Sequence, residues 1–270
     1  MNRIDRAFER ARGERRAALI VFVTAGDPDL ETSAELVPEL AAAGADVVEL
    51  GIPHSDPIGE GPTIQASSQR SLTHHTTLAQ ILELVRRVRA VSEVPLVLMG
   101  YLNNVLAHGE ERVAKDAAAA GADGLIVSDT PFEETEALSR ACAESGVHRV
   151  LLVAPTSTPA RVVRIAAASR GFVYCVSVTG VTGSRQALPP DLSRLVGRIR
   201  RVTSTPVCVG FGVSTPEQAS EVARLADGVI VGSALVSRIG AAKGRDDAIR
   251  SAREFVAELA SAVRAARRKA

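Results

Sequence analysis

The chain has 270 residues, of which 46% are hydrophobic and 23% are charged, so it has the apolar content of a folded protein with a large core. Its 32 basic and 31 acidic residues leave a formal charge of +1, which argues against binding to nucleic acid or to a membrane surface, since such proteins usually carry a basic excess. No apolar run approaches the roughly 18 residues that span a bilayer. The N-terminal residues 1–16 are charged throughout and contain no apolar signal core, so we expect a cytoplasmic protein.

Strand-like and helix-like patterns alternate along the whole chain. Eight short β-branched runs are predicted as strands: Leu19–Thr24, Asp46–Leu50, Pro95–Met99, Gly124–Ser128, His148–Ala154, Phe172–Val176, Pro206–Val209 and Gly228–Val231. Apolar strands that alternate with helices indicate a parallel sheet covered by helices. Eight such units in 270 residues are typical of an α/β (β/α)8 TIM barrel. The rival, a doubly wound open sheet, lacks support because no G-x-G-x-x-G follows the first strand.

The ends of the chain and its joints complete this prediction. Residues 1–12 are expected to form an extra N-terminal helix and residues 245–268 the last helix, with no linker, so that 1–270 is a single TIM-barrel domain. Similar helix-to-strand joints recur at 41–50, 118–127 and 224–231, the first two with a glycine where a helix C-cap requires a left-handed residue. The three cysteines, Cys142, Cys175 and Cys208, are widely spaced in apolar segments and are expected to be buried thiols, not disulfides or zinc ligands.

The loops after the seventh and eighth strands favour a phosphate site. The first contains two glycines around Phe211, and in the second Gly232 and Ser233 open a short helix. Backbone N–H groups at a helix start can bind a phosphate dianion, and barrels often place one at these two loops. The alternative is that Ser214 and Ser233 are ordinary helix caps.

An acidic residue is expected inside the second strand. Alternation places Val47 and Glu49 on one face of this strand. If Leu50 packs against helices, Glu49 points into the barrel near its active end, where burial would raise the pKa of the carboxyl group and suit it to proton donation near neutrality. The alternative is a structural Glu–Arg pair inside the barrel.

The loop that follows, residues 51–63, is long for a connection between a strand and a helix, and long loops at this end of a barrel are usually functional. It contains two further carboxylates, Asp56 and Glu60. Asp56 could be only a turn residue, whereas Glu60 lies between glycines and can swing towards the barrel mouth. His54 shares no metal-ligand spacing with the other histidines, so no metal site is expected.

Other residues at the predicted strand ends leave two readings open. Tyr174 is either a site residue or a core tyrosine with a bonded hydroxyl, and the Gly/Thr-rich segment 177–185 is either a mobile lid or an ordinary surface loop. The three lysines, Lys115, Lys243 and Lys269, do not follow any predicted strand. A Schiff-base aldolase needs a desolvated lysine there, which leaves phosphate anchoring and carboxylate acid–base chemistry.

Several motifs taken together resemble the tryptophan synthase α chain family from end to end. They are GDP (26–28), ELGIPHSDP (49–57), GPTIQ (61–65), SDTPFEE (128–134), VAPTST (153–158), GFVYCVSVTGVTG (171–183) and GFGVST (210–215). The resemblance implies retro-aldol cleavage of indole-3-glycerol phosphate to indole and glyceraldehyde 3-phosphate. It also implies a pyridoxal-phosphate-containing β chain as partner in an αββα complex, with no cofactor in this chain.

The resemblance also assigns roles to individual residues. The implied catalytic residues are Glu49 as acid–base at indole C3, Glu60 at the indole N–H, and Tyr174. The implied substrate-binding residues are Phe22, Tyr101, Thr182, Gly183, Phe211, Gly212, Gly232 and Ser233. The implied partner-facing residues are Pro53, His54 and Asp56.

The chain departs from the family pattern at two positions of one loop. Glu60 stands where the family usually has Asp, and His54 where it usually has Phe. An extra methylene moves a carboxylate by about 1 Å, a displacement that can change a rate about 100-fold. The alternatives are therefore a stand-alone lyase of the same family, a weakly active paralogue that mainly binds and activates a β chain, and a phosphate-handling barrel isomerase of another kind.

Overall fold

Parallel strands form a closed ring in the computed structural model, which describes residues 1–176, 191–210 and 212–266. The strands in this part of the chain are β1 Ala18–Thr24, β2 Val47–Gly51, β3 Leu96–Gly100, β4 Gly124–Val127, β5 His148–Arg149, β6 Leu151–Val153, β7 Val173–Val176, β8 Val207–Gly210 and β9 Gly228–Val231. Their order is β5-β4-β3-β2-β1-β9-β8-β7-β6. Only Val150 separates β5 from β6, so these two segments form one interrupted strand. Counted in this way, the ring has the eight strands predicted for a TIM barrel.

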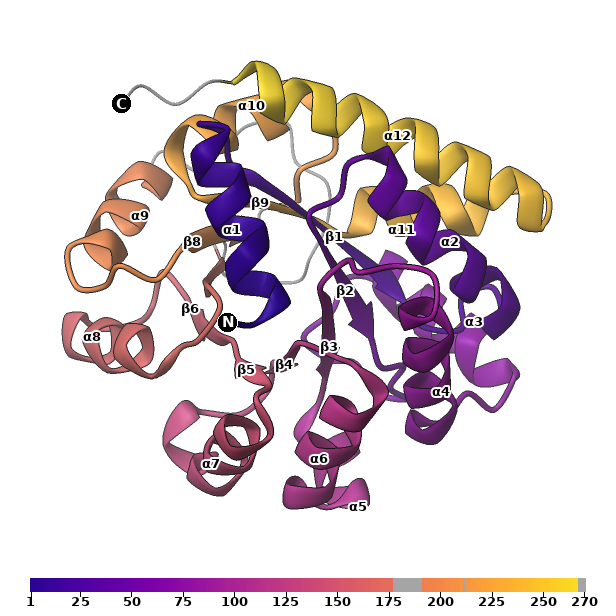
Figure 1. Cartoon of the computed structure of the whole chain (residues 1–270), viewed down its shortest axis with the longest axis horizontal. Helices are drawn as coiled ribbons and strands as arrows, with labels where there is room; N and C mark the ends of the chain where they lie inside the picture. The colour runs from indigo at the N-terminus through magenta and orange to yellow at the C-terminus, as the bar shows by residue number, and fades with distance from the viewer. Residues whose placement is uncertain (177–190, 211, 267–270) are drawn as a thin grey trace.

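Helices surround this ring (Figure 1). They are α1 Arg3–Gly13, α2 Leu30–Ala43, α3 Pro62–Thr73, α4 Leu78–Arg89, α5 Leu102–His108, α6 Glu110–Ala120, the 3-10 turn η1 Phe132–Glu134, α7 Glu136–Ser145, α8 Pro159–Ala168, α9 Leu192–Arg200, α10 Pro216–Leu225, α11 Ser233–Ala241 and α12 Arg245–Ala265. Gly44 and Gly121 end α2 and α6 with φ of 114° and 97°, the left-handed conformation that glycine adopts without strain. Both C-caps were predicted from the sequence.

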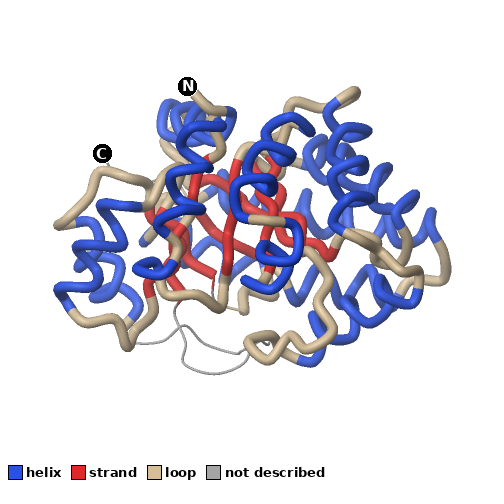
Figure 2. The backbone as a smooth tube through the Cα atoms, turned by 90° about the horizontal axis from the view of Figure 1, so that it is seen from below, coloured by secondary structure: helices blue, strands red, loops and turns tan. Residues whose placement is uncertain are grey.

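The barrel contains two separate apolar layers. Outward side chains of the strands pack with the surrounding helices into one large cluster that includes Val48 and Leu50. The inward side chains form a second cluster: Ala18, Ile20, Val47, Val97, Ile126, Val150, Phe172, Cys208 and Ile230. Helix α1 closes this interior at the N-terminal end of the strands, with Ile4 and Phe8 buried in the same cluster. Figure 2 shows α1 at one end of the strands, so the opposite end is left for the βα loops.

A recurring aspartate anchors the start of three strands. Asp46, Asp123 and Asp227 precede β2, β4 and β9, and each carboxylate accepts the backbone N–H of a residue on the neighbouring strand, from Leu19, Leu96 and Val207 at 2.9, 2.9 and 3.0 Å. Each aspartate also forms an ion pair with arginine. Asp46 pairs with Arg16, Asp123 with Arg3 and Arg89, and Asp227 with Arg200. The repeated joints seen in the sequence are therefore hydrogen-bonded clamps at the N-terminal end of the barrel.

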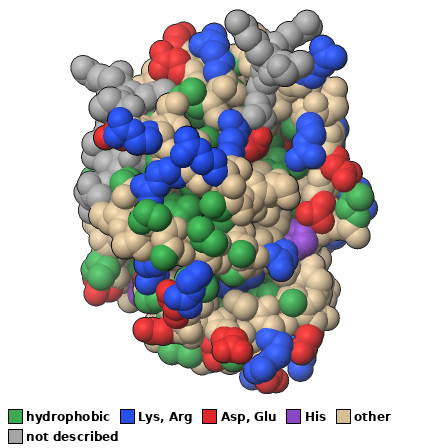
Figure 3. All heavy atoms as spheres, turned by 90° about the vertical axis from the view of Figure 1, so that its left-hand side faces the viewer, with side chains coloured by type: hydrophobic (Ala, Val, Ile, Leu, Met, Phe, Trp, Pro, Cys, Tyr) green, Lys and Arg blue, Asp and Glu red, His purple; other side chains and the backbone are tan. Residues whose placement is uncertain are grey.

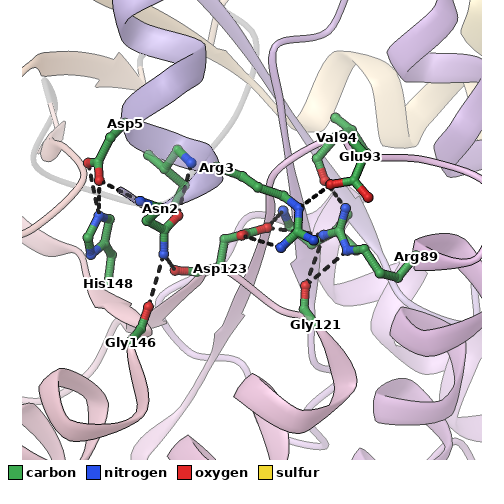
Figure 4. Close-up of polar contacts among 12 residues, drawn as sticks. Asn2, Arg3, Asp5, Arg89, Glu93, Val94, Gly121, Asp123, Gly146 and His148 are labelled. Carbon is green, nitrogen blue, oxygen red and sulfur yellow. Dashed lines mark hydrogen bonds and ion pairs between the residues drawn. The ribbon is translucent and has the colours of Figure 1, made fainter.

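The clamp at Asp123 also holds the N-terminal helix (Figure 4). Arg3 of α1 and Arg89 of α4 both bond the Asp123 carboxylate, at 3.2 and 3.1 Å. The Asn2 side chain donates to the Asp123 carbonyl, and Asp5 accepts from His148 at 2.9 Å. This polar cluster fixes α1 across the barrel end, away from the βα loops.

The surface is uneven in charge despite the small net charge. The exposed or half-exposed arginines on and beside α8 and α9 are Arg161, Arg164, Arg170, Arg194, Arg198, Arg200 and Arg201. Figure 3 views this side of the molecule, where basic side chains lie around an apolar centre. The three cysteines are buried and free, as expected. None of the helices in the described part of the chain has the length and apolarity needed to cross a bilayer.

Candidate active site

Glu49 lies inside the barrel on the layer nearest the βα loops. Its neighbours across the sheet are Phe22 of β1 and Val97 of β3. Val47, two residues earlier, belongs to the interior cluster, and Val48 and Leu50 belong to the outer one. Because side chains alternate along a strand, Glu49 projects into the interior.

The Glu49 carboxylate is buried and has no partner in the described part of the chain. It is 0% exposed, and neither oxygen forms a hydrogen bond there. Burial raises its pKa to about 8, and the negative charge of Glu60 contributes to the rise. The alternative of a structural Glu–Arg pair is therefore wrong within residues 1–176, 191–210 and 212–266. A carboxyl group with this pKa keeps its proton near neutrality and can donate it.

Tyr174 lies across the interior from Glu49 on β7. Burial raises its pKa well above the usual value, and the Glu49 charge is the next cause, so the two groups are within electrostatic reach. Gly210 of β8 gives the tyrosine room, because a Cβ at that position would lie 2.5 Å from the hydroxyl oxygen. A side chain at position 210 would displace Tyr174.

The loop after β2 brings Glu60 to the mouth of the barrel. Glu60 is half-buried. It lines a narrow cavity together with Phe22, Met99 and Tyr101, and the volume of this cavity is about 20 Å³. Such a space holds about one water molecule, so Glu60, Phe22, Met99 and Tyr101 lie close together at the mouth of the barrel.

Phe22 connects this cavity with the start of α11. Its ring covers Gly51, where a Cβ would lie 2.4 Å from a ring carbon, and a Cβ at Gly232 would lie 3.5 Å from Phe22. Gly232 is the N-cap of α11 and Ser233 its first residue, with no side-chain cap. The free N–H end of this helix, which attracts anions, is therefore next to an apolar ring.

The helix-cap alternative for the two serines does not match the structure. Thr215 caps α10 with its side chain, and Ser214 donates to the Gln218 side chain instead. Ser233 lies inside α11. Gly212 has φ of 53°, so the turn before α10 uses a left-handed glycine.

The remaining predicted residues are distributed along the loops. Pro53 is buried, His54 half-buried and Asp56 exposed, and the Asp56 carbonyl accepts the N–H of Ile58 in a turn. Tyr101 is 7% exposed and stacks on His54. The predictions for Thr182, Gly183 and Phe211, and for a lid at 177–185, lie outside the described residues.

The cavity also has lining residues that the sequence analysis did not single out, among them Ile64, Met99 and Ser128. Met99, on β3, is in register with Gly51 on β2 and packs against Phe22 and Ile64. Its position as the inward-facing last apolar residue of a predicted strand was the available signal. Ile64 comes from the first turn of α3, and only the fold brings it to the cavity.

The described residues contain no cluster of three His, Cys, Asp or Glu side chains that could hold a metal ion. Lys115 lies in α6 and Lys243 between α11 and α12, so neither directly follows a strand. Among the described residues, Glu49, Glu60, Tyr101 and Tyr174 come together at this end of the barrel, with His54 stacked on Tyr101 and a helix N-terminus nearby.

Comparisons with known proteins identify the family of the chain. The family model of the tryptophan synthase alpha chain matches residues 8–264. The chain is 53% identical over 237 residues to the tryptophan synthase alpha chain of Geobacter sulfurreducens, covering 87% of this chain and 89% of that protein. It is 49% identical to that of Acidiphilium cryptum over the full length of both.

Solved structures give the same result. A structure of Mycobacterium tuberculosis tryptophan synthase superposes with a TM-score of 0.90 at 38% identity, over 97% of this chain and 98% of that one. A tryptophan synthase subunit alpha from Legionella pneumophila has the same TM-score, identity and coverage. The chain belongs to the tryptophan synthase alpha chain family.

Proposed function

We propose that the chain cleaves indole-3-glycerol phosphate to indole and glyceraldehyde 3-phosphate, the lyase reaction of its family in tryptophan biosynthesis, with Glu49 as general acid–base. The observation that supports this role most strongly is the buried Glu49 carboxyl, whose pKa is raised to about 8. A group with this pKa is mostly protonated at pH 7, and is therefore ready to protonate an aromatic carbon.

The reaction needs two proton transfers around one breaking bond. Glu49 gives a proton to C3 of the indole ring, which places positive charge on the ring nitrogen. Glu60 accepts a hydrogen bond from the ring N–H and stabilises that charge. The Glu49 carboxylate left by the first transfer then takes the proton of the adjacent glycerol hydroxyl. As that hydroxyl becomes the aldehyde, the carbon–carbon bond between C3 and the glycerol chain breaks and its electrons return to the ring. Tyr174, across the interior from Glu49, helps to orient the site, as the family resemblance implies.

The same site binds both ends of the substrate. Phe22 and Met99 provide apolar contact for the indole ring. The N-terminus of α11, at Gly232 and Ser233, binds the phosphate dianion through backbone N–H groups. The phosphate contacts also include Gly183, Phe211 and Gly212, of which Gly212 lies in the described part of the chain.

The proposed partner is a tryptophan synthase β chain that carries pyridoxal phosphate, in an α2β2 complex. Pro53, His54 and Asp56 lie on the loop that also contains Glu60, so docking at this loop would act directly on the site. The loop's departures from the family pattern, His54 and Glu60, favour one second candidate, a lyase that works alone. Comparing indole release with and without a β chain distinguishes the two, because a coupled α chain accelerates many-fold on mixing.

Glu49→Gln tests the proposed function directly. Removing the acid is expected to lower kcat by a factor of about 100 to 10,000, measured as indole release. Glu258→Gln, an exposed change on α12, is the matched control and should retain the wild-type rate. Equal rates for wild type and Glu49→Gln would exclude Glu49 as the acid.

Glu60→Asp tests whether the longer side chain is adapted to this loop. The loop backbone is fixed on both sides of the carboxylate, since the Glu60 N–H donates to Pro57 and its carbonyl accepts from the Gln65 side chain, both at 2.9 Å. Shortening the side chain should withdraw the carboxylate by about 1 Å and lower kcat by up to about 100-fold. A higher kcat in Glu60→Asp would instead indicate a degenerate paralogue.

A further inference from the structure

His54 is joined to the barrel frame by an aromatic contact. Its imidazole stacks on the Tyr101 ring with 4.6 Å between centroids and 12° between planes. His54 belongs to the loop that contains Glu60, whereas Tyr101 is the N-cap of α5, directly after β3. The stack therefore connects a loop to a strand end.

Tyr101 provides a firm base for this contact. Its own N–H donates to Asn104 Oδ1 at 3.1 Å, and the next N–H, of Leu102, donates to Asp129 Oδ1 at 2.8 Å. The ring is 7% exposed. With its own N–H and the N–H of Leu102 bonded and its ring buried, Tyr101 is a base against which a loop residue can be positioned.

The other end of the tyrosine reaches the backbone beside Glu60. A Cβ built on Gly59 would lie 3.4 Å from the Tyr101 hydroxyl oxygen, which is ordinary van der Waals contact. Burial raises the pKa of Tyr101 to about 12, and the Glu60 charge is the next largest cause. Both Tyr101 and Glu60 line the small cavity proposed for the indole ring. Tyr101 therefore stacks on the loop at position 54, and its hydroxyl lies close to the backbone next to position 60.

Open space surrounds His54 away from Tyr101. It lines one hollow of about 440 Å³, bounded by α3, α4 and α5 residues such as Leu72, Leu78 and Asn103, and a second of about 460 Å³ with Asp56 and Gln65. Without the stack the imidazole could rotate into either hollow. The contact with Tyr101 therefore holds the His54 side chain in place, between backbone hydrogen bonds at Ile52 and at Glu60 that hold the loop on either side.

We propose that His54 is a positioning residue for Glu60: by stacking on Tyr101 it sets the depth at which the loop presents the Glu60 carboxylate to the indole nitrogen. His54 itself does not touch the reacting atoms. The inference rests on the proposed function for the role of Glu60, whereas the contact between the two rings can be tested without any reaction.

The stack has a direct spectroscopic test, because the chain contains two tyrosines and no tryptophan. Selective ¹³C labelling of tyrosine rings gives two sets of NMR signals, and Tyr174→Phe identifies those of Tyr101. His54→Leu should shift the Tyr101 ring signals, since an aromatic neighbour is lost, whereas the exposed His74→Leu should not. Identical Tyr101 spectra in wild type and His54→Leu would overturn the stack and the proposal with it.

Kinetics then test whether the stack acts through Glu60. His54→Leu is expected to lower kcat for indole release about 10- to 100-fold, the size of effect that a misplacement of about 1 Å produces, with KM within about threefold. His54→Phe keeps a flat ring on Tyr101 and should restore most of the rate. A rate in His54→Phe as low as in His54→Leu would contradict positioning by stacking.

A double-mutant cycle separates positioning from general loosening of the loop. In a Glu60→Gln background, His54→Leu should cause little further loss, because the group it positions is already removed. Full additivity of the two losses would overturn the proposal. A wild-type chain that releases no indole, while the Tyr101 signals still respond to His54→Leu, would refute the proposed function and leave the stack established.

Discussion

Individual charged side chains inside this barrel have very different surroundings. Glu49 is 0% exposed and has no hydrogen-bond partner in the described residues. Its protonation is therefore controlled by burial rather than by a counter-ion, and the raised pKa is the direct result. The same property that makes the group an acid near neutrality also makes its ionised form costly for the fold.

This cost predicts a pH dependence of stability. The folded pKa of about 8 lies above the ordinary value of 4.5, so the folded chain holds a proton that the unfolded chain loses between these values. The stabilising contribution is present in full below about pH 4.5 and is lost as the pH rises to about 8. The free energy of unfolding of wild type should therefore fall relative to that of Glu49→Gln as the pH rises from 5.5 to about 8, by roughly 1 kcal/mol per pH unit, and then level off. Urea unfolding at the two pH values measures it, and a constant difference would show that Glu49 titrates normally.

The same pKa predicts the pH profile of the reaction. Since the protonated carboxyl is the acid, kcat for indole release should decrease above pH about 8. Steady-state rates from pH 6 to 10 show whether this limb exists. A rate that stays level to pH 10 would separate catalysis from Glu49 ionisation.

Arg149 is a second buried charge, this time a guanidinium, and its side chain has no carboxylate partner in the described residues. It is 3% exposed, its Nε and Nη2 atoms have no hydrogen-bond partner within the described residues, and burial lowers its pKa to about 10. Arg89 is also largely buried but bonds Asp123 and several carbonyls. We expect Arg149→Met to leave the free energy of unfolding unchanged or to raise it, and Arg89→Met to lower it by about 3–5 kcal/mol. Urea titrations of both variants decide this, and a large loss in Arg149→Met would reveal a partner for that guanidinium.

At the scale of elements, the aspartates that begin β2, β4 and β9 join neighbouring strands at the N-terminal end of the barrel. The Asp123 carboxylate bonds the Leu96 N–H and two arginines from different helices. It is 3% exposed, so the three donors would lose their partner in a region with little water. A strand end, a barrel helix and the N-terminal helix all depend on this one side chain.

Asp123→Ala should therefore destabilise the fold by about 3–5 kcal/mol, as expected when one member of a buried ion pair is removed. KM should stay unchanged, because the clamp is at the end of the barrel opposite the site. Glu83→Ala breaks an exposed pair with Arg86 on α4 and should cost less than about 1 kcal/mol. Thermal unfolding with parallel indole assays tests both, and equal melting temperatures for the two variants would contradict the clamp.

At the scale of the whole molecule, the two ends of the barrel have separate tasks. Helix α1 closes one end with Ile4, Ala7, Phe8 and Ala11 buried against the interior cluster. The proposed catalytic residues and the start of α11 lie at the other end. Stability and chemistry are therefore separated along the barrel axis, as is general for this architecture.

Phe8→Ala tests that separation. The Phe8 ring is 5% exposed and lies 5.8 Å from the ring of Phe172, centroid to centroid, so its removal leaves a cavity and should cost about 3–5 kcal/mol. At a temperature where the variant remains folded, kcat and KM should equal the wild-type values. A loss of activity without loss of stability would show that the two ends are coupled.

The amino-acid sequence by itself determined the number and order of the strands, the glycine C-caps, the extra N-terminal helix and the presence of Glu49 in the second strand. These follow from local periodicity and backbone conformation, which neighbouring residues control. The strand predicted at His148–Ala154 is present, but it is not continuous, because the hydrogen-bonded strand is interrupted at Val150. Periodicity indicates extended backbone and does not report where pairing breaks.

The tertiary structure alone decided what surrounds each of these residues. It showed that Glu49 has no counter-ion in the described part of the chain, that Ile64 and Met99 join the cavity, and that Tyr101 stacks on His54 with its hydroxyl near the backbone at Gly59. Burial, pKa and stacking depend on groups distant in sequence that the closed ring of strands brings together. Local pattern contains no information about those distances, and for this reason the chemistry of the site became visible only once the barrel was closed.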